Sequence, residues 1–264
     1  MAVTVDSQMA SSVAANVNFA TSLTYSFTNT AGTYLVVGAE CNAQSANPAA
    51  TITGVTYAGA TVTKYAATEA SWDTGARSVG AFYTKQAPAT GANNVVVSLS
   101  VSDNIISGAI SVTGAAASAA EANGTANTSG SSTVSPTLTL TNVQASSLCL
   151  AWYGHGAAIQ TPTLNAGQVQ SAFVDVNANT AGNNYTLTRF TGSGTLSPTC
   201  TVSVADQWGC GAMEILAVAS SIAPMMSLMG VGLGVRLLAA VQLRRPHSRR
   251  RFFKSMCAMV LGPK

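Results

Sequence analysis

The stretch NVVVSLSV, from Asn94 to Val101, decides how this chain folds. Its large apolar residues Val95, Val97, Leu99 and Val101 occupy every second position. Because successive side chains of a β-strand point to opposite faces, these four side chains share one face. This period of two predicts a strand that is buried on one side, as in an antiparallel sheet.

The same kind of pattern extends from Ala2 to Ala219. Short runs of β-branched and aromatic residues alternate with small polar ones, and clusters of Gly, Asn, Pro and Ser separate them about every ten residues. No run of helical period occurs before residue 220, so the body is predicted to be all-β. The predicted strands are Leu23–Thr28, Tyr34–Cys41, Thr51–Tyr57, Thr61–Ala66, Ser78–Thr84, Asn94–Val101, Ile105–Thr113, Thr137–Thr141, Leu148–Tyr153, Gln168–Val176, Tyr185–Phe190, Thr199–Val204 and Cys210–Val218.

Two halves of this body resemble one another. The segment SVSDNIISGAISV (Ser100–Val112) aligns without a gap with SVADQWGCGAMEI (Ser203–Ile215). Between the halves lies AAASAAEANGTANTSGSSTVSP (Ala115–Pro136), which has almost no large apolar residue and is predicted to be a connector. We therefore expect one domain, 1–219, with halves 1–114 and 136–219 and a linker at 115–135. A duplicated meander of this kind favours a two-sheet antiparallel β-sandwich, jelly-roll-like in its connections.

Charge is distributed unevenly along the 264 residues. Residues 1–220 carry four basic and nine acidic side chains, whereas the last 44 residues carry eight basic and no acidic ones. The body lacks a stripe of Lys and Arg that could follow phosphates, so nucleic acid is not an expected partner. The excess of basic residues next to an apolar run indicates instead that this part of the chain contacts a membrane.

The C-terminal segment has the composition of a membrane anchor. Ile222–Leu243 is 22 residues, about 33 Å as a helix, which is enough to cross a bilayer. We predict a hydrophobic helix over 220–243 and a basic tail over 244–264 that stays cytoplasmic. The alternative is a C-terminal extension that does not insert. The first 25 residues have neither a basic nor an apolar region of a signal peptide. The arginines assigned to the anchor are Arg236, Arg244, Arg245, Arg249, Arg250 and Arg251.

The five cysteines are widely spaced and form no CxxC pair, so neither a zinc site nor a disulfide scaffold is indicated. Two interpretations are open for Cys200 and Cys210. They form a cross-strand disulfide, or they are two half-buried thiols. The body has a single histidine, His155, and no GxSxG motif. No spacing singles out a pair of carboxylates, although Glu214, in a predicted half-buried strand, would be the first to test. No catalytic residue, metal or cofactor is therefore expected.

Exposed aromatic rings are the groups with which a β-protein stacks on sugar faces. Trp72 and Asp73, in the polar stretch TEASWDTG, form the first candidate pair. Trp152, Tyr153 and His155, at a predicted strand end, form a second cluster. For Trp152 and for Trp208, burial in the sheet is the competing interpretation.

A further set of motifs links the chain to a known module. These are GVTYAGATVTKY (Gly54–Tyr65), RSVGAFYTKQAPATGANNVVVSLS (Arg77–Ser100), SGAISVTG (Ser107–Gly114) and WGCGAMEILAVA (Trp208–Ala219). Together they resemble a poorly characterised, lectin-like or jelly-roll β-sandwich module of bacterial surface proteins and phage-associated proteins.

The resemblance implies display or adhesion without catalytic residues, at a virion or a bacterial cell surface, with a glycan or host-surface receptor as partner and with homo-oligomers as one form. A packing protein of a phage capsid or tail is the alternative, and a carbohydrate-active enzyme is a third hypothesis.

Overall fold

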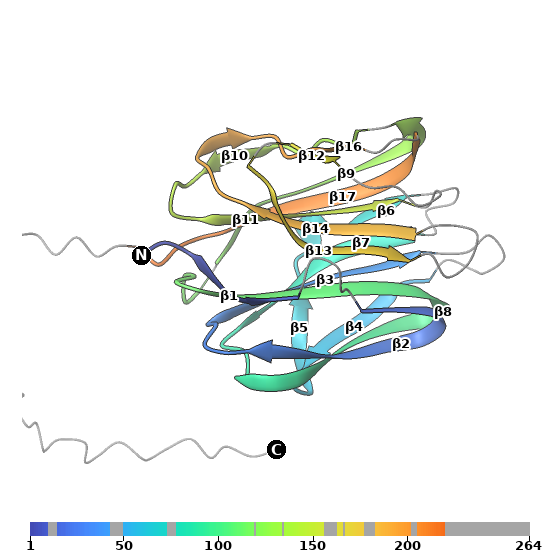
Figure 1. Ribbon diagram of the computed structural model, residues 1–264, viewed down its shortest axis with the longest axis horizontal. Helices are drawn as coiled ribbons and strands as arrows, with labels where there is room; N and C mark the ends of the chain where they lie inside the picture. Colours follow the sequence, from blue (N-terminus) through green and yellow to red (C-terminus); the bar gives the residue numbers. More distant parts are fainter. Residues whose placement is uncertain are drawn as a thin grey trace, which may run out of the picture. The chain divides into compact units, whose positions relative to one another are not determined.

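The computed structural model describes residues 1–9, 15–42, 50–72, 78–118, 120–133, 135–155, 163–165, 167–176, 183–201 and 205–219 (Figure 1). The all-β prediction is confirmed: the described chain is built from antiparallel strands, with one three-residue 3₁₀ turn, η1 (Ala66–Thr68). One compact unit spans Met1–Ser221. Among the described residues, none forms a helix long and apolar enough to cross a membrane. The helix predicted at 220–243 and the anchor arginines lie outside the described residues.

The first sheet contains eight strands from the N-terminal half. Its path runs β1-β8-β3-β7-β5-β4, with β2 beside β8 and β6 beside β7. Because β4 also pairs with β8, the strands β8, β3, β7, β5 and β4 close into a ring. This closed ring was not predicted from the sequence, which indicated only two facing sheets. The bounds are β1 (Thr4–Gln8), β2 (Ala15–Asn29), β3 (Tyr34–Asn42), β4 (Ile52–Tyr57), β5 (Ala60–Lys64), β6 (Ala70–Trp72), β7 (Ser78–Gln86) and β8 (Gly91–Thr113).

Strand β8 makes the ring possible because its two halves belong to different layers. Its first half pairs with β4, and its second half pairs with β3 and β1, while β2 runs beside both halves. The two strands predicted at Asn94–Val101 and Ile105–Thr113 are thus one bent strand. Its partner β2 has register shifts between Val17 and Ser22, so both strands turn the corner together.

The second half forms a five-stranded sheet of order β13-β14-β11-β17-β9, with two small two-stranded sheets, β10-β15 and β12-β16. The bounds are β9 (Glu121–Thr133), β10 (Leu140–Val143), β11 (Leu148–His155), β12 (Thr163–Leu164), β13 (Val169–Val176), β14 (Asn183–Phe190), β15 (Gly194–Leu196), β16 (Cys200–Thr201) and β17 (Asp206–Ile215).

The linker predicted at 115–135 is wrong over most of its length. Glu121–Thr133 form β9, an outer strand that pairs with β17. The segment consists mainly of Gly, Ala, Ser, Thr and Asn, which carry little apolar area. For this reason its sequence predicted a connector. An edge strand is held mainly by backbone hydrogen bonds, and these do not depend on side-chain type.

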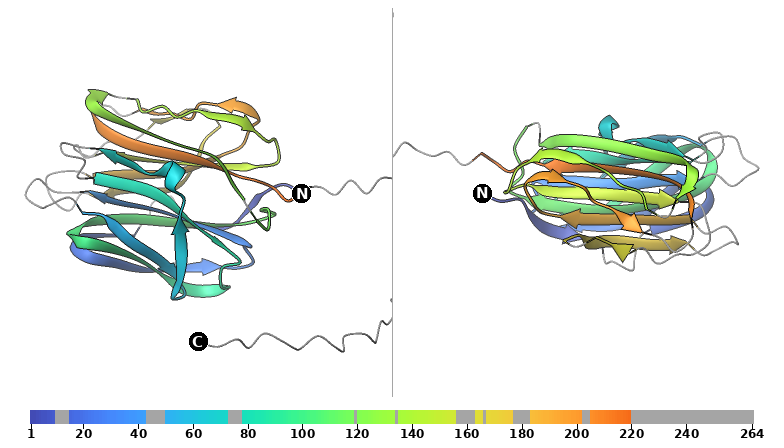
Figure 2. Two further views of the ribbon diagram at one scale, coloured as in Figure 1. Left: turned by 180° about the vertical axis from the view of Figure 1, so that it is seen from behind. Right: turned by 90° about the horizontal axis from the view of Figure 1, so that it is seen from above.

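The strands are stacked in layers, from β2 and β4 at the bottom of Figure 1 to β10, β12 and β16 at the top. Figure 2 shows the same layers from two further sides. Three apolar clusters lie between these layers. One cluster fills the closed ring, with Val37, Tyr57 and Val97 among its members. The central cluster lies between the ring and the five-stranded sheet and includes Phe82 and Trp152. The third lies beyond the five-stranded sheet, beneath β10 and β12.

Glycines opposite aromatic rings bring the two halves together. A Cβ at Gly80 of β7 would lie 2.7 Å from the Trp152 ring, and a Cβ at Gly38 of β3 would meet the Tyr185 hydroxyl. The Trp152 and Tyr185 rings are stacked, with centroids 6.2 Å apart. The absence of side chains at two positions of one sheet therefore makes room for two large side chains of the other.

Candidate functional site

The structure corrects the expectation that Trp72 is an exposed stacking surface. Its side chain is 3% exposed and lies against Trp152, with ring centroids 5.8 Å apart. A Cβ at Gly209 would clash with the Trp72 ring, so the absence of a side chain there provides the space for the indole. The polar residues around Trp72 in sequence suggested a surface position, but β6 turns the ring inward. Asp73 lies outside the described residues.

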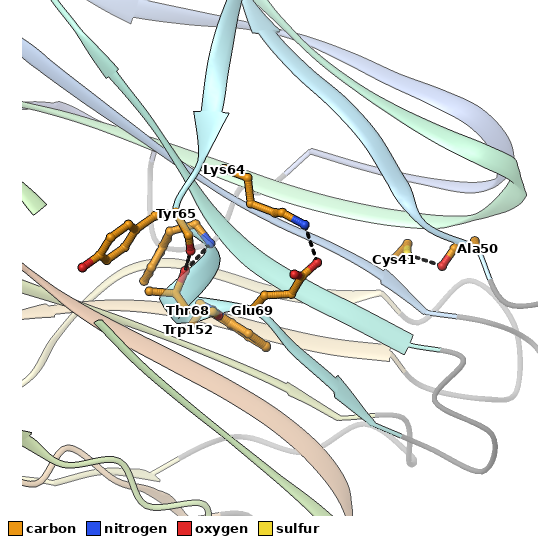
Figure 3. Close-up of polar contacts among 8 residues, drawn as sticks. Cys41, Ala50, Lys64, Tyr65, Thr68, Glu69 and Trp152 are labelled. Carbon is orange, nitrogen blue, oxygen red and sulfur yellow. Dashed lines mark hydrogen bonds and ion pairs between the residues drawn. The ribbon is translucent and has the colours of Figure 1, made fainter. Parts of the chain in front are cut away.

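The second predicted cluster is divided between two faces of β11. Trp152 is fully buried in the central cluster, and its Nε1 donates to the Thr68 carbonyl at 3.0 Å (Figure 3). Tyr153 points to the opposite face, where its hydroxyl donates to Gln168 Oε1 at 3.2 Å. His155 ends β11 and is 6% exposed. These three residues therefore form no common exposed surface, and burial of Trp152 and Trp208 is confirmed.

Cys200 and Cys210 are buried free thiols, as are Cys41 and Cys149. Burial raises the pKa of the Cys200 thiol to about 12, so at neutral pH it is protonated. The thiol interpretation is confirmed for this pair, and the disulfide interpretation is wrong.

Glu214 has a local structural role. It is fully buried, its Oε1 accepts the Gln144 backbone N–H at 2.8 Å, and its Oε2 accepts from the Asn123 side chain. The carboxylate thereby ties β17 to the residue after β10 and to β9.

Glu40 is also fully buried. Burial raises the pKa of this carboxyl well above its usual value, and a hydrogen bond from Asn42 offsets part of the effect. Its Oε2 has no hydrogen-bond partner among the described residues.

One groove lined by described residues has a volume of about 520 Å³ and lies where β5 and β7 of the first sheet meet the start of β9. We call it the β5–β7 groove. It combines one aromatic ring with hydroxyls, an amide, two ammonium groups and a carboxylate. Its lining residues are Thr61, Thr63, Lys64, Tyr65, Thr84, Lys85, Gln86 and Glu121.

Glu121 contributes the groove's negative charge from the first position of β9. Its Oε1 accepts the Thr84 hydroxyl at 2.7 Å and also the Tyr34 hydroxyl. Burial raises the pKa of the Glu121 carboxyl, but the hydrogen bonds from Tyr34, Thr84 and the Glu121 backbone together outweigh burial, and the pKa lies below its usual value. The carboxylate is therefore ionised at neutral pH, and its other oxygen can accept hydrogen bonds from a ligand.

The two ammonium groups of the groove are held by neighbouring groups. Lys64 Nζ lies 2.7 Å from Glu69 Oε1, an exposed ion pair that Figure 3 shows beside Tyr65. Lys85 Nζ donates to the Thr61 carbonyl at 3.2 Å. The Tyr65 ring packs over β9, since a Cβ at Gly124 would lie 2.6 Å from its Cε1 atom. These contacts position Lys64, Lys85 and Tyr65 at the groove.

Sequence reasoning missed this groove entirely. Thr63 and Thr84 are cross-strand neighbours in β5 and β7, but Glu121 comes from a segment that looked like a connector. The only sequence signal for the groove was the alternation of Thr61 and Thr63, which indicates that one face of this strand is polar. Comparison of the chain with known protein families, with curated proteins and with solved structures found no match.

Proposed function

We propose that this protein is a non-enzymatic β-protein for display or adhesion, at a virion or bacterial cell surface, and that it binds carbohydrate in the β5–β7 groove. The observation that carries the proposal is the composition of the groove, which sets the half-buried Tyr65 ring near the ionised Glu121 carboxylate. This site replaces Trp72 as the stacking surface.

Each part of the groove matches one feature of a sugar. A pyranose has an apolar face that packs on an aromatic ring, and hydroxyls on its rim that both donate and accept hydrogen bonds. Glu121 accepts from hydroxyls, Lys85 donates to them, and the Gln86 amide can do both. Hydrogen bonds to a charged carboxylate are stronger than those between neutral groups.

A single groove is expected to bind weakly. A stacked aromatic ring contributes on the order of 1 kcal/mol beyond its buried area. The groove is also open and polar, so water competes for its hydrogen bonds. Useful adhesion would then rely on many copies acting together.

The finer fold prediction, a duplicated jelly-roll-like sandwich, belongs to the same proposal. The order β7-β3-β8 in the first half has the counterpart β14-β11-β17 in the second. Outside these triplets, β1 lies beside β8 as β9 lies beside β17. Gly91 and Gly194, which begin β8 and β15, both have positive φ, 84° and 77°. On this basis the second repeat begins near residue 115.

The experiment is a glycan array with the full chain, followed by titration of the strongest ligand. We expect Tyr65→Ala and Glu121→Gln each to weaken binding at least tenfold. Phe19→Ala, which removes an aromatic ring that is 49% exposed outside the groove lining, should bind as the unchanged chain does.

An array without hits, or equal binding by the groove variants and the control, would reject the site. Release of sugar products from the array ligands would instead favour the enzyme hypothesis.

A packing protein of a phage capsid or tail remains the second candidate function. The observation that favours it is the outer edge of β2, which pairs with no other strand of the described chain and is suited to contacts between copies. Assembly into particles by a chain that binds no glycan would support it.

A further inference from the structure

Strand β2 is paired along one edge only. Its 15 residues form an antiparallel ladder with β8 from Ala15↔Ser107 to Asn29↔Gly91. No other strand in the described part of the chain pairs with β2. The outer backbone N–H and C=O groups of β2 therefore have no strand partner among the described residues and can pair with an added strand.

The sequence of β2 lacks the usual protection of an exposed edge. Proteins block such edges with charged side chains, prolines or bulges. Ala15–Asn29 contains no charged residue and no proline. Its register shifts lie between Val17 and Ser22, so Ser22–Asn29 is a regular eight-residue edge opposite Ser98–Gly91.

The side chains of this regular edge alternate strictly. Leu23 and Phe27 are 6% and 4% exposed and belong to the cluster that fills the ring, and Tyr25 packs against the same cluster. On the other face Thr24, Ser26 and Thr28 are exposed. A strand added beside β2 would therefore extend both an apolar face and a hydroxyl face.

We propose that a second copy of this chain pairs with β2, antiparallel and about a two-fold axis at Ser26. In this arrangement Ser26 lies opposite Ser26 of the other copy, and Thr24 lies opposite Thr28. Serine and threonine pairs across antiparallel strands stabilise the pairing, and no like charges are opposed because the strand is uncharged. Tyr25 and Phe27 of both copies then continue one apolar face across the two-fold axis.

A second copy fits this edge better than an unrelated strand because the edge is self-complementary. A two-fold contact uses the same patch on both molecules, and Thr24–Thr28 places hydroxyl against hydroxyl and apolar against apolar in that arrangement. A ladder from Leu23 to Asn29 buries less than the roughly 1,600 Å² of a standard interface, so the dimer should depend on concentration. Close spacing on a surface would favour it. This inference does not depend on the glycan groove.

The first experiment is disulfide trapping of the full chain. Directly opposed Cβ atoms lie about 4.5–5.5 Å apart across an antiparallel pair, close enough for a disulfide after small shifts. We expect Ser26→Cys to give a covalent dimer on mild oxidation. Thr53→Cys, at an exposed position of β4, a strand that pairs with β8 along one edge and with β5 from Val55 onward along the other, is the control and should remain monomeric under the same conditions.

The second experiment is sedimentation velocity over a hundredfold range of concentration. The unchanged chain and Thr53→Lys should shift toward the dimer together, while Ser26→Lys should remain monomeric with an unchanged circular dichroism spectrum. A chain that stays monomeric throughout and gives no Ser26→Cys cross-link above the control would overturn the pairing, and would leave the edge to a strand from another protein. Dimers that form equally in Ser26→Lys would overturn it as well.

Discussion

The contact between Gly80 and Trp152 offers the sharpest test of how the two halves are joined. Replacing Gly80 with alanine places a Cβ 2.7 Å from the Cη2 and Cζ3 atoms of Trp152 and 3.2 Å from Cε3. The indole has little freedom to withdraw, since it is fully buried, donates to the Thr68 carbonyl and contacts the Trp72 and Tyr185 rings. The added methyl group must therefore strain the core.

The expected magnitude follows from two opposing effects. An extra methyl in a well-packed core typically costs about 1–3 kcal/mol. Alanine in a strand is favoured over glycine by roughly 0.5–1 kcal/mol because the unfolded chain loses less entropy. The net effect of Gly80→Ala should be a loss of about 1–2 kcal/mol in the free energy of unfolding.

A matched variant and a double variant make the test specific. Gly54→Ala, in β4, meets no heavy atom within 4 Å, so it should be neutral or slightly stabilising. Trp152→Phe removes ring atoms that the new methyl would touch. Combined with Gly80→Ala, it should recover about 1–2 kcal/mol relative to the sum of the single changes.

Urea unfolding followed by far-ultraviolet circular dichroism gives the free energy of unfolding of the unchanged chain and of each variant without relying on tryptophan emission. If Gly80→Ala behaves like Gly54→Ala, or if the double variant is simply additive, the packing of the halves described above is wrong.

Two further predictions concern the buried acid and the C-terminal segment. Because the folded-state pKa of Glu40 is raised above its ordinary value of 4.5, its contribution to stability is complete below that pH and is lost as the pH rises toward the folded-state pKa. Urea midpoints measured at pH 5 and pH 8 should therefore fall with pH in the unchanged chain and fall less in Glu40→Gln; equal slopes would contradict the assignment. For the tail, we expect the full chain to remain with carbonate-washed membranes and a chain ending at Ala219 to stay in the supernatant, because Ile222–Leu243 is uncharged except for Arg236. Recovery of both chains in the supernatant would show that the segment is not an anchor.

The sequence by itself determined the class of fold and the position of most strands. Period-two patterns such as Val95, Val97 and Leu99 depend only on which side of a strand faces apolar neighbours, and that information is local. The same holds for the strand at Tyr34–Cys41, whose observed bounds are nearly those predicted. Likewise, the absence of helical period before residue 220 is a local property, and the described body has only η1.

Tertiary structure decided what each strand and each aromatic ring does. Trp72 follows polar residues, yet it is buried because Gly209 leaves space on the opposing sheet. β9 has no apolar pattern, yet it is a strand because the free edge of β17 supplies its backbone partners. Glu121 then meets Thr84 and Tyr34, which are distant in sequence, and completes the groove. These outcomes depend on contacts between segments far apart in the chain, and alternation within one segment carries no information about which distant residue will face it.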